Sequence, residues 1–113
     1  MIELSHEIGD GVLVLAPKGR MDHNTAKSFE DQSTLLIDKG PNKIAIDFSG
    51  VEYISSAGLR AILVIAQRTK SAGGMLTFCA VNENVRNLFQ VCGFDSVFGV
   101  HATLKEAKAA LAG

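Results

Sequence analysis

Hydrophobic and polar residues alternate in a strand-like pattern at the start of the chain. Residues 2–8, IELSHEI, alternate apolar with polar side chains, which is typical of a half-buried strand. The turn residues GDG at 9–11 separate this segment from a second apolar run at 12–19, VLVLAPKG. Two strands joined by so short a glycine-bearing turn predict a β-hairpin.

Helix-like and strand-like segments follow one another in the middle of the chain. A helix is predicted over 24–38, because its apolar residues fall roughly on one face and the turn residues GPN at 40–42 follow it. The apolar runs at 43–48 and 75–81 are short and bounded by turn residues, which predicts two buried strands.

The helix predicted between those two strands is apolar on every side at its start. Nearly every residue from 59 to 66 is apolar, and Gly73 and Gly74 end the segment. A helix that is hydrophobic all round is usually buried. We therefore expect Leu59, Ile62 and Leu63 to pack against the sheet.

The last third of the chain predicts two further helices and a short strand. Asn82 is a suitable N-cap for a helix with one apolar face, 93–100 suggests a turn and a short strand, and residues 103–106 match the capping box of a final helix. The complete order is β-β-α-β-α-β-α-β-α. It predicts an α/β fold, with a mixed, mostly parallel sheet, an N-terminal hairpin and about four packed helices.

Length and charge limit the classes of protein that the chain could represent. Its 113 residues suit a single domain, 1–113, and 47% hydrophobic residues are enough for a sizeable core. Eleven basic against twelve acidic residues give a net charge of −1, which is no electrostatic footprint for nucleic acid. The longest apolar stretch, 61–66, is too short to span a bilayer, and the N-terminus does not resemble a signal peptide. We expect a cytoplasmic protein.

No motif in the sequence indicates catalysis, a metal or a cofactor. Cys79 and Cys92 lack CxxC or Cys/His spacing and lie among apolar residues, so we expect two buried, reduced thiols. Ile54 occupies the position where a GxSxG nucleophile motif requires glycine, and the glycine-rich phosphate and dinucleotide loops are absent. The three histidines are far apart in sequence: His6, His23 and His101. We expect a protein that is not an enzyme, with no catalytic residue, metal site or cofactor.

Two adjacent hydroxyls, Ser55 and Ser56, stand where the strand-like run gives way to the apolar helix. One interpretation is structural, because a serine N-cap stabilises a helix by about 1 kcal/mol relative to alanine. The other is chemical, because a helix start attracts anions such as phosphate. Gly58 costs about 1 kcal/mol relative to alanine in a helix, so close backbone approach or exposed N–H groups would have to compensate. From these residues alone, capping is favoured here, and also for Asp22 at the start of the first helix.

The segment 44–63, IAIDFSGVEYISSAGLRAIL, resembles the signature of the STAS domain, the fold of bacterial anti-sigma factor antagonists. The flanking segments agree, since GRMDHNTA at 19–26 is similar to the family's Gly-x-Leu-Asp segment and residues 80–107 are similar to its carboxyl half. The resemblance covers essentially the whole chain and implies the STAS fold.

The resemblance also implies a phosphorylation site. The family's central motif reads Asp-Ser-Ser/Thr/Ala-Gly-Leu, and its serine is phosphorylated by a partner that is both anti-sigma factor and serine kinase. Alignment on Gly58 and Leu59 places that serine at Ser56, and Asp22 on an acidic position beside it. The chain departs from the motif at Ser55, where the family usually has aspartate.

The function implied by the resemblance is that of an anti-sigma factor antagonist. The unphosphorylated chain would bind an anti-sigma factor with serine kinase activity and release a sigma factor, and phosphate on Ser56 would end that binding. A serine phosphatase is a further candidate partner. Two other functions stay open: a non-phosphorylated STAS subunit of a membrane transport ATPase assembly, and a small-molecule or nucleotide-sensing module. The expected binding surface consists of Asp22, His23, Tyr53, Ile54, Ser55, Ser56, Ala57 and Gly58.

Overall fold

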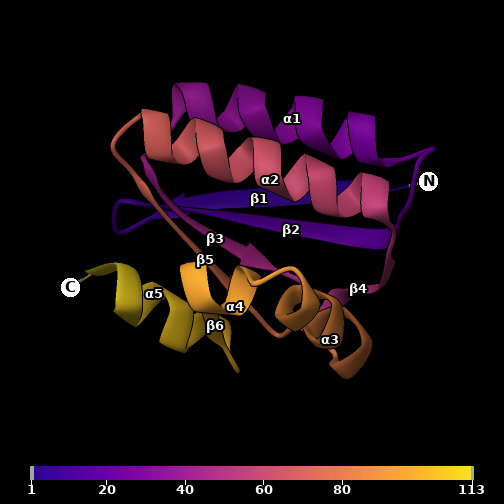
Figure 1. Cartoon of the computed structure of the whole chain (residues 1–113). Helices are drawn as coiled ribbons and strands as arrows, with labels where there is room; N and C mark the ends of the chain where they lie inside the picture. Colours follow the sequence, from indigo (N-terminus) through magenta and orange to yellow (C-terminus); the bar gives the residue numbers. More distant parts are fainter. Residues whose placement is uncertain (1, 113) are drawn as a thin grey trace.

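The chain begins with an antiparallel hairpin (Figure 1). The computed structural model describes residues 2–112. Strand β1 (Ile2–Gly9) pairs along its whole length with β2 (Val12–Met21). Asp10 and Gly11 connect the two strands with φ values of 54° and 76°. Two residues with positive φ form the kind of turn that matches the twist of a hairpin, so the predicted hairpin is confirmed.

Six strands form one mixed sheet within residues 2–112. β1 is antiparallel to β2 and every other pairing is parallel, in the order β1-β2-β3-β5-β6 with β4 also paired to β2. The predicted mixed, mostly parallel sheet is confirmed. The remaining strands are β3 (Lys43–Asp47), β4 (Gly50–Ile54), β5 (Met75–Cys79) and β6 (Gly99–His101).

Strand β4 is absent from the element order that the sequence pattern predicted. β3 pairs with the first half of β2, the chain leaves the sheet at Phe48 and Ser49, and β4 then pairs with the second half. The interruption is held by a hydrogen bond from Ser49 N to Asp47 Oδ1 of 2.9 Å and by one from Val51 N to Phe48 O of 2.9 Å. The turn residues at 49–50 indicate in the sequence that a strand ends there. Only the tertiary structure shows that the chain then pairs with β2 a second time, as β4.

The helices cover the sheet from both sides (Figure 1). α1 and α2 lie side by side on one face, whereas α5 packs on the other against β3 and β5. α3 packs against β4 and α4 against β6. The segment predicted as a turn and a short strand forms α4 before β6, and the rings of Phe94 and Phe98 at the two ends of α4 pack edge to face at 5.9 Å. The helices are α1 (Ala26–Lys39), α2 (Ser56–Ser71), α3 (Glu83–Val91), α4 (Phe94–Val97) and α5 (Leu104–Ala112).

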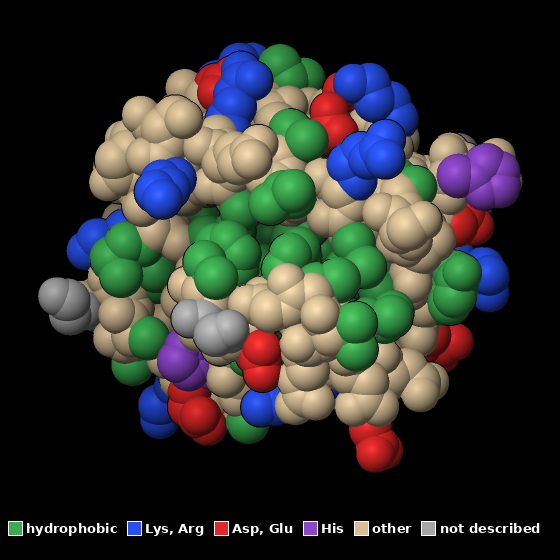
Figure 2. Space-filling model, in the orientation of Figure 1, with side chains coloured by type: hydrophobic (Ala, Val, Ile, Leu, Met, Phe, Trp, Pro, Cys, Tyr) green, Lys and Arg blue, Asp and Glu red, His purple; other side chains and the backbone are tan. Residues whose placement is uncertain are grey.

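Helix α2 is buried on one side only. Ile62 is fully buried and Leu59 is half-buried, but the Leu63 side chain is 43% exposed, so its predicted burial is wrong. The reason is that α2 has the sheet below it and α1 beside it, while nothing in the described chain covers its outer side. Figure 2 shows apolar side chains gathered in a hollow between α2 and α4. A pocket lined by residues of α2, β5 and α4 includes the half-exposed Met75.

The two cysteines differ in burial. Cys79 lies fully buried beneath α5, as predicted, and burial together with the nearby Asp47 carboxylate raises the pKa of its thiol to about 12. Cys92 is exposed, so its predicted burial is wrong. Val85 and Phe89 occupy the buried side of α3, and Cys92 follows as the C-cap where the helix ends and the chain turns away.

Candidate functional site

The carboxyl ends of β2 and β4 bring Asp22 and the two serines to one edge of the sheet. Met21 and Ile54 are aligned as neighbours in these parallel strands. The next residue along, Ser55, donates its backbone N–H to Met21 O at 2.8 Å. Two segments about thirty residues apart in sequence therefore enter α1 and α2 side by side, at the place where open α/β sheets commonly carry their functional residues.

The two hydroxyls at the start of α2 have different environments. Ser55 is extended, with φ −95° and ψ 177°, and its Oγ accepts a hydrogen bond from the Gly58 N–H at 3.3 Å. It is the N-cap. Ser56 is the first residue of the helix and its side chain is exposed. The structure therefore assigns the capping role to Ser55 and leaves the Ser56 hydroxyl open to solvent.

Gly58 allows α2 to lie directly against the ends of β2 and β4. It is buried, and a Cβ atom there would lie 2.6 Å from Ile54 Cγ1 and 2.9 Å from the backbone oxygen of Met21. The first of these distances is far inside van der Waals contact, and the second involves backbone that cannot move aside cheaply. Close approach is thus the compensation for a glycine in the first turn.

Asp22 organises the loop that leads into α1. Its Oδ1 accepts hydrogen bonds from the Asn24 N–H at 3.0 Å and from the Thr25 hydroxyl at 3.3 Å. The helix itself has Thr25 as its N-cap residue, so the carboxylate closes the preceding turn instead of capping α1. Desolvation alone would raise the pKa of Asp22, but these hydrogen bonds and the charge of Arg20 outweigh it and lower the pKa below its usual value. The carboxylate is therefore negative at neutral pH.

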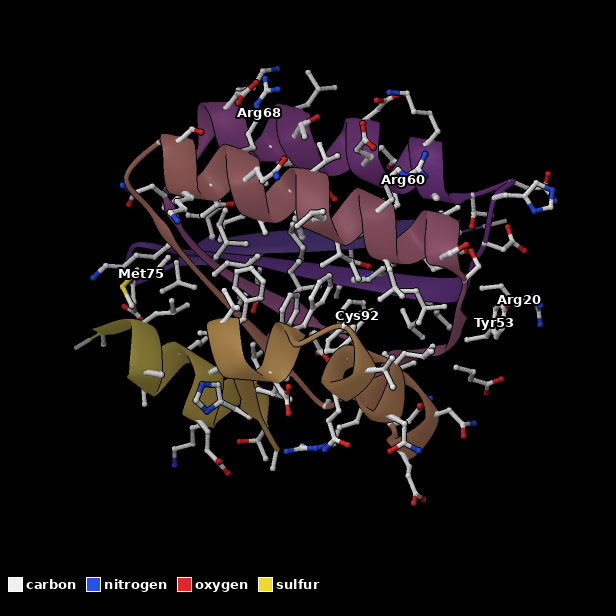
Figure 3. The ribbon with its side chains drawn as sticks, in the orientation of Figure 1. Arg20, Tyr53, Arg60, Arg68, Met75 and Cys92 are labelled. Atoms are coloured by element: carbon white, nitrogen blue, oxygen red, sulfur yellow. The ribbon has the colours of Figure 1, made fainter. Side chains whose placement is uncertain are left out.

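Arg20 and Tyr53 form an exposed pair next to Asp22 (Figure 3). The Arg20 guanidinium carbon lies 4.5 Å from the centre of the Tyr53 ring, within the range of a cation–π contact. Arg20 Nε is also 3.7 Å from an Asp22 carboxylate oxygen. The sequence analysis did not single out Arg20. The outward position of Arg20 follows from strand alternation, but its contact with Tyr53 depends on the pairing of β2 with β4.

An open pocket of about 270 Å³ lies between the first halves of α1 and α2. Ser56 forms part of its wall, and charged side chains from both helices surround it, several of which the sequence analysis missed. Its lining residues are His23, Ala26, Lys27, Glu30, Ser56, Ala57 and Arg60.

The residues of the predicted binding surface differ in exposure, and Asp22, Ser55 and Ala57 are half-buried. His23, Tyr53 and Ser56 are exposed and lie around one end of the sheet. Ile54 and Gly58 are buried, so their side chains or close contacts support this surface from beneath.

Two negative findings apply to the part of the chain that the structure describes. Between residues 2 and 112, no helix is both long and apolar enough to cross a membrane. Over the same range, no three His, Cys, Asp or Glu side chains are grouped so that they could hold a metal ion.

This fold and this site define a class of protein. The family model described as the STAS domain matches residues 3–107, so the chain belongs to the STAS domain family. The predicted fold class is confirmed by both the architecture and the structural neighbours.

Individual relatives point to one type of STAS protein. BtrV of Bordetella bronchiseptica, named as a candidate anti-sigma factor antagonist, is 36% identical over 101 residues, covering 89% of this chain and 86% of that protein. The anti-sigma-F factor antagonist RsfB of Mycobacterium tuberculosis is 29% identical over 100 residues, covering 87% and 80%. An anti-sigma factor antagonist from Mycobacterium paratuberculosis has a crystal structure that superposes with a TM-score of 0.91 at 26% identity, covering 100% and 96%. All three of these proteins are named as anti-sigma factor antagonists.

Proposed function

We propose that this chain is an anti-sigma factor antagonist that is switched by phosphorylation of Ser56. The observation that carries the proposal is the different use of the two serines. Ser55 is engaged as the N-cap of α2, whereas Ser56, which aligns with the family phosphosite, exposes its hydroxyl beside a pocket. Its relatives carry names of the same function.

In the unphosphorylated state, residues 1–113 act as one STAS domain that binds an anti-sigma factor and thereby releases a sigma factor. The contact surface surrounds the ends of β2 and β4. Tyr53 supplies an aromatic face whose position is set by Arg20, and Asp22 supplies a carboxylate that stays charged at neutral pH. Exposed aromatic and arginine side chains are frequent anchors of protein interfaces. We place this interaction in the cytoplasm.

In the phosphorylated state, the surface no longer fits the partner. The anti-sigma factor itself supplies the serine kinase activity, and a serine phosphatase restores the hydroxyl. A phosphoserine carries about −1.5 to −2 charges at neutral pH. Added at the edge of the sheet that also carries Asp22, this charge makes the surface more negative without unfolding the domain. In this proposal the chain is the substrate of the kinase and the phosphatase and not itself an enzyme.

Ser55 in place of the usual aspartate changes where the negative charge of the site lies. Its hydroxyl is committed to the Gly58 N–H and carries no charge. Asp22, at the same edge of the sheet, then supplies a carboxylate that Asn24 and Thr25 hold in place. We therefore assign to Asp22 the role of orienting the kinase.

Calorimetry with the anti-sigma factor captured by the native chain tests the proposal. Ser56→Ala should keep the affinity within a few-fold, because the hydroxyl is a small part of the surface. Ser56→Asp should weaken binding tenfold to a hundredfold, which corresponds to about 1.4–2.8 kcal/mol. Enzymatically phosphorylated protein should bind more weakly still, because phosphate carries more charge than a carboxylate. Ser71→Asp is the matched control, since it adds the same charge at the exposed far end of α2.

Equal affinities of the wild type, Ser56→Asp and the phosphorylated protein would exclude the switch. The alternative of a non-phosphorylated subunit of a transport assembly would then be favoured. A thermal shift with nucleotides in the absence of any protein partner would instead favour the sensing module.

A further inference from the structure

The pocket beside Ser56 carries charged groups from two helices. The charged side chains are those of Lys27 and Glu30 from α1 and of Arg60 from α2, and the His23 side chain also lines the pocket from the loop before α1. Some of these charged groups form an ion pair within the chain and others do not. A positively charged group without an ion pair is available to bind an added anion such as phosphate.

Lys27 is already matched. Its Nζ lies 3.2 Å from a carboxylate oxygen of Glu30 and 3.2 Å from one of Asp31. The same ion pair neutralises the negative charge on the pocket wall, because the carboxylate that lines the pocket is that of Glu30.

Arg60, by contrast, is unmatched. Between residues 2 and 112, its guanidinium takes part in no ion pair and in no side-chain hydrogen bond. Arg68, two turns later on the same helix, shows the usual arrangement, with two contacts to Asp38 of 3.0 Å and 2.6 Å. Within residues 2–112, the Arg60 guanidinium is therefore a positive charge on the pocket wall that no carboxylate neutralises.

The helix directs Arg60 toward Ser56. Residues four apart lie on the same side of an α-helix, and side chains lean toward the helix N-terminus. Arg60 therefore leans back over the first turn of α2, where Ser56 lies, and both residues line the same pocket. In Figure 3, Arg60 lies in the first half of α2, on the side of α1.

We propose that a phosphate on Ser56 is held by Arg60 of the same chain as an ion pair inside this pocket, an inference that rests on the proposed modification of Ser56. The planar guanidinium can donate two parallel hydrogen bonds to phosphate oxygens. Phosphorylation then changes two side chains at once. It adds a bulky anion at Ser56, and it withdraws from the partner the free guanidinium of Arg60. An aspartate at position 56 is shorter than phosphoserine and forms this pair less well.

The pair can be measured without a kinase or a partner. Phosphoserine is incorporated at position 56 during translation, and the second ionisation of the phosphate is followed by phosphorus NMR as a function of pH. The usual second pKa of a phosphoserine is about 6. A neighbouring positive charge favours the dianion, so the folded protein should titrate below its urea-unfolded reference by roughly half a unit or more. Lys27, Glu30 and His23 also line this pocket and can affect the phosphate pKa, so the comparison must change Arg60 alone.

Arg60→Gln should raise the phosphate pKa back toward the unfolded reference. Glutamine is a good helix former, and Arg60 is exposed, so the fold should be retained. Arg68→Gln is the matched control, because it removes an arginine from the same helix far from Ser56, and it should leave the phosphate pKa unchanged. Equal phosphate pKa values in the wild type and Arg60→Gln, or equal shifts in both variants, would overturn the proposal.

The outcomes separate this proposal from the function on which it rests. If the phosphoprotein titrates as expected but binds the anti-sigma factor as tightly as the unmodified chain, the switch fails and the Arg60 pair stands. If phosphorylation abolishes binding while Arg60→Gln leaves the titration unchanged, the switch stands and the pair is overturned.

Discussion

The two sides of helix α2 have opposite properties. Its inner side carries Gly58 and Ile62, which are buried against the ends and the face of the sheet. Its outer side carries Ser56, Arg60 and Leu63, which are exposed. The inner side sets the position of the helix, and the outer side presents the chemistry that a partner would meet.

This difference teaches that adjacent residues of α2 should not be assigned one shared role. Successive residues are about 100° apart around a helix, so neighbours such as Ser55 and Ser56, or Ile62 and Leu63, face different surroundings. Residues on the outer side are not needed to hold the helix in place. They are therefore free to serve recognition, and substitutions that distinguish the two sides test this separation directly.

The largest effect is expected where the inner side is emptied. Ile62→Ala should lower the free energy of unfolding by about 2–5 kcal/mol, because it leaves a cavity in a fully buried site. Leu63→Ala, one residue further and 43% exposed, should cost less than about 1 kcal/mol. Chemical denaturation of both variants makes the comparison, and equal losses would show that α2 is covered on both sides.

The next effect concerns the close contact at the start of the helix. Gly58→Ala should lower the free energy of unfolding by about 1–3 kcal/mol, because its Cβ would overlap with Ile54 and with the backbone of Met21. In an uncrowded helix the same change would stabilise by up to about 1 kcal/mol. A stabilised variant in thermal or chemical denaturation would therefore contradict the close approach of α2 to the strand ends.

The two cysteines show the same contrast between a buried and an exposed side chain in another part of the molecule. The buried one, Cys79, predicts that the stability of the fold depends on pH. The thiol of Cys79 has a pKa raised from 9.0 to about 12 in the folded state. A raised folded-state pKa contributes stability that is complete below pH 9 and is lost as the pH rises toward 12. Stability should fall by about 1.4 kcal/mol between pH 8 and pH 10 from this group. In the Cys79→Ala variant, the free energy of unfolding should fall less between pH 8 and pH 10. If chemical denaturation gives the same pH dependence for the wild type and this variant, the raised pKa of Cys79 is wrong.

A thiol reagent provides an independent check on the same pair. Exposed Cys92 should react quickly in the native protein, whereas Cys79 should react at least a hundredfold more slowly, because it is buried and rarely ionised. In denaturant the two rates should converge. Cys92→Ser identifies the fast phase, which should disappear in that variant.

The smallest effect separates the two serines. Ser55→Ala should lower the free energy of unfolding by about 1 kcal/mol, because it removes the hydrogen bond to the Gly58 N–H. Ser56→Ala should change it by less than about 0.5 kcal/mol, since Ser56 is exposed and caps nothing. A larger loss for Ser56→Ala than for Ser55→Ala would reverse the assignment of the cap.

The sequence pattern predicted most of the elements because local signals were strong. The Asp10–Gly11 turn specifies a hairpin through its positive φ values, and Asn82 caps α3 by accepting the Val85 N–H at 2.9 Å. β4 was missed because its separation from β3 depends on which half of β2 each segment pairs with. The short α4 was missed because a single helical turn has too few residues to show a helical period.

The candidate site was also predicted only in part, because some of its features are local in sequence and others depend on tertiary contacts. By itself the sequence determined the hydroxyl pair, the glycine behind it and the resemblance that singles out Ser56, since these are properties of consecutive residues. It did not determine which serine caps the helix or which side of an all-apolar helix faces solvent. Nor did it determine that, within residues 2–112, Arg60 forms no ion pair while Arg68 forms one. Those properties depend on the neighbours that β2, β4 and α1 bring from distant parts of the chain. Only the tertiary structure decides them, because burial and charge pairing are set by contacts in space and not by order along the chain.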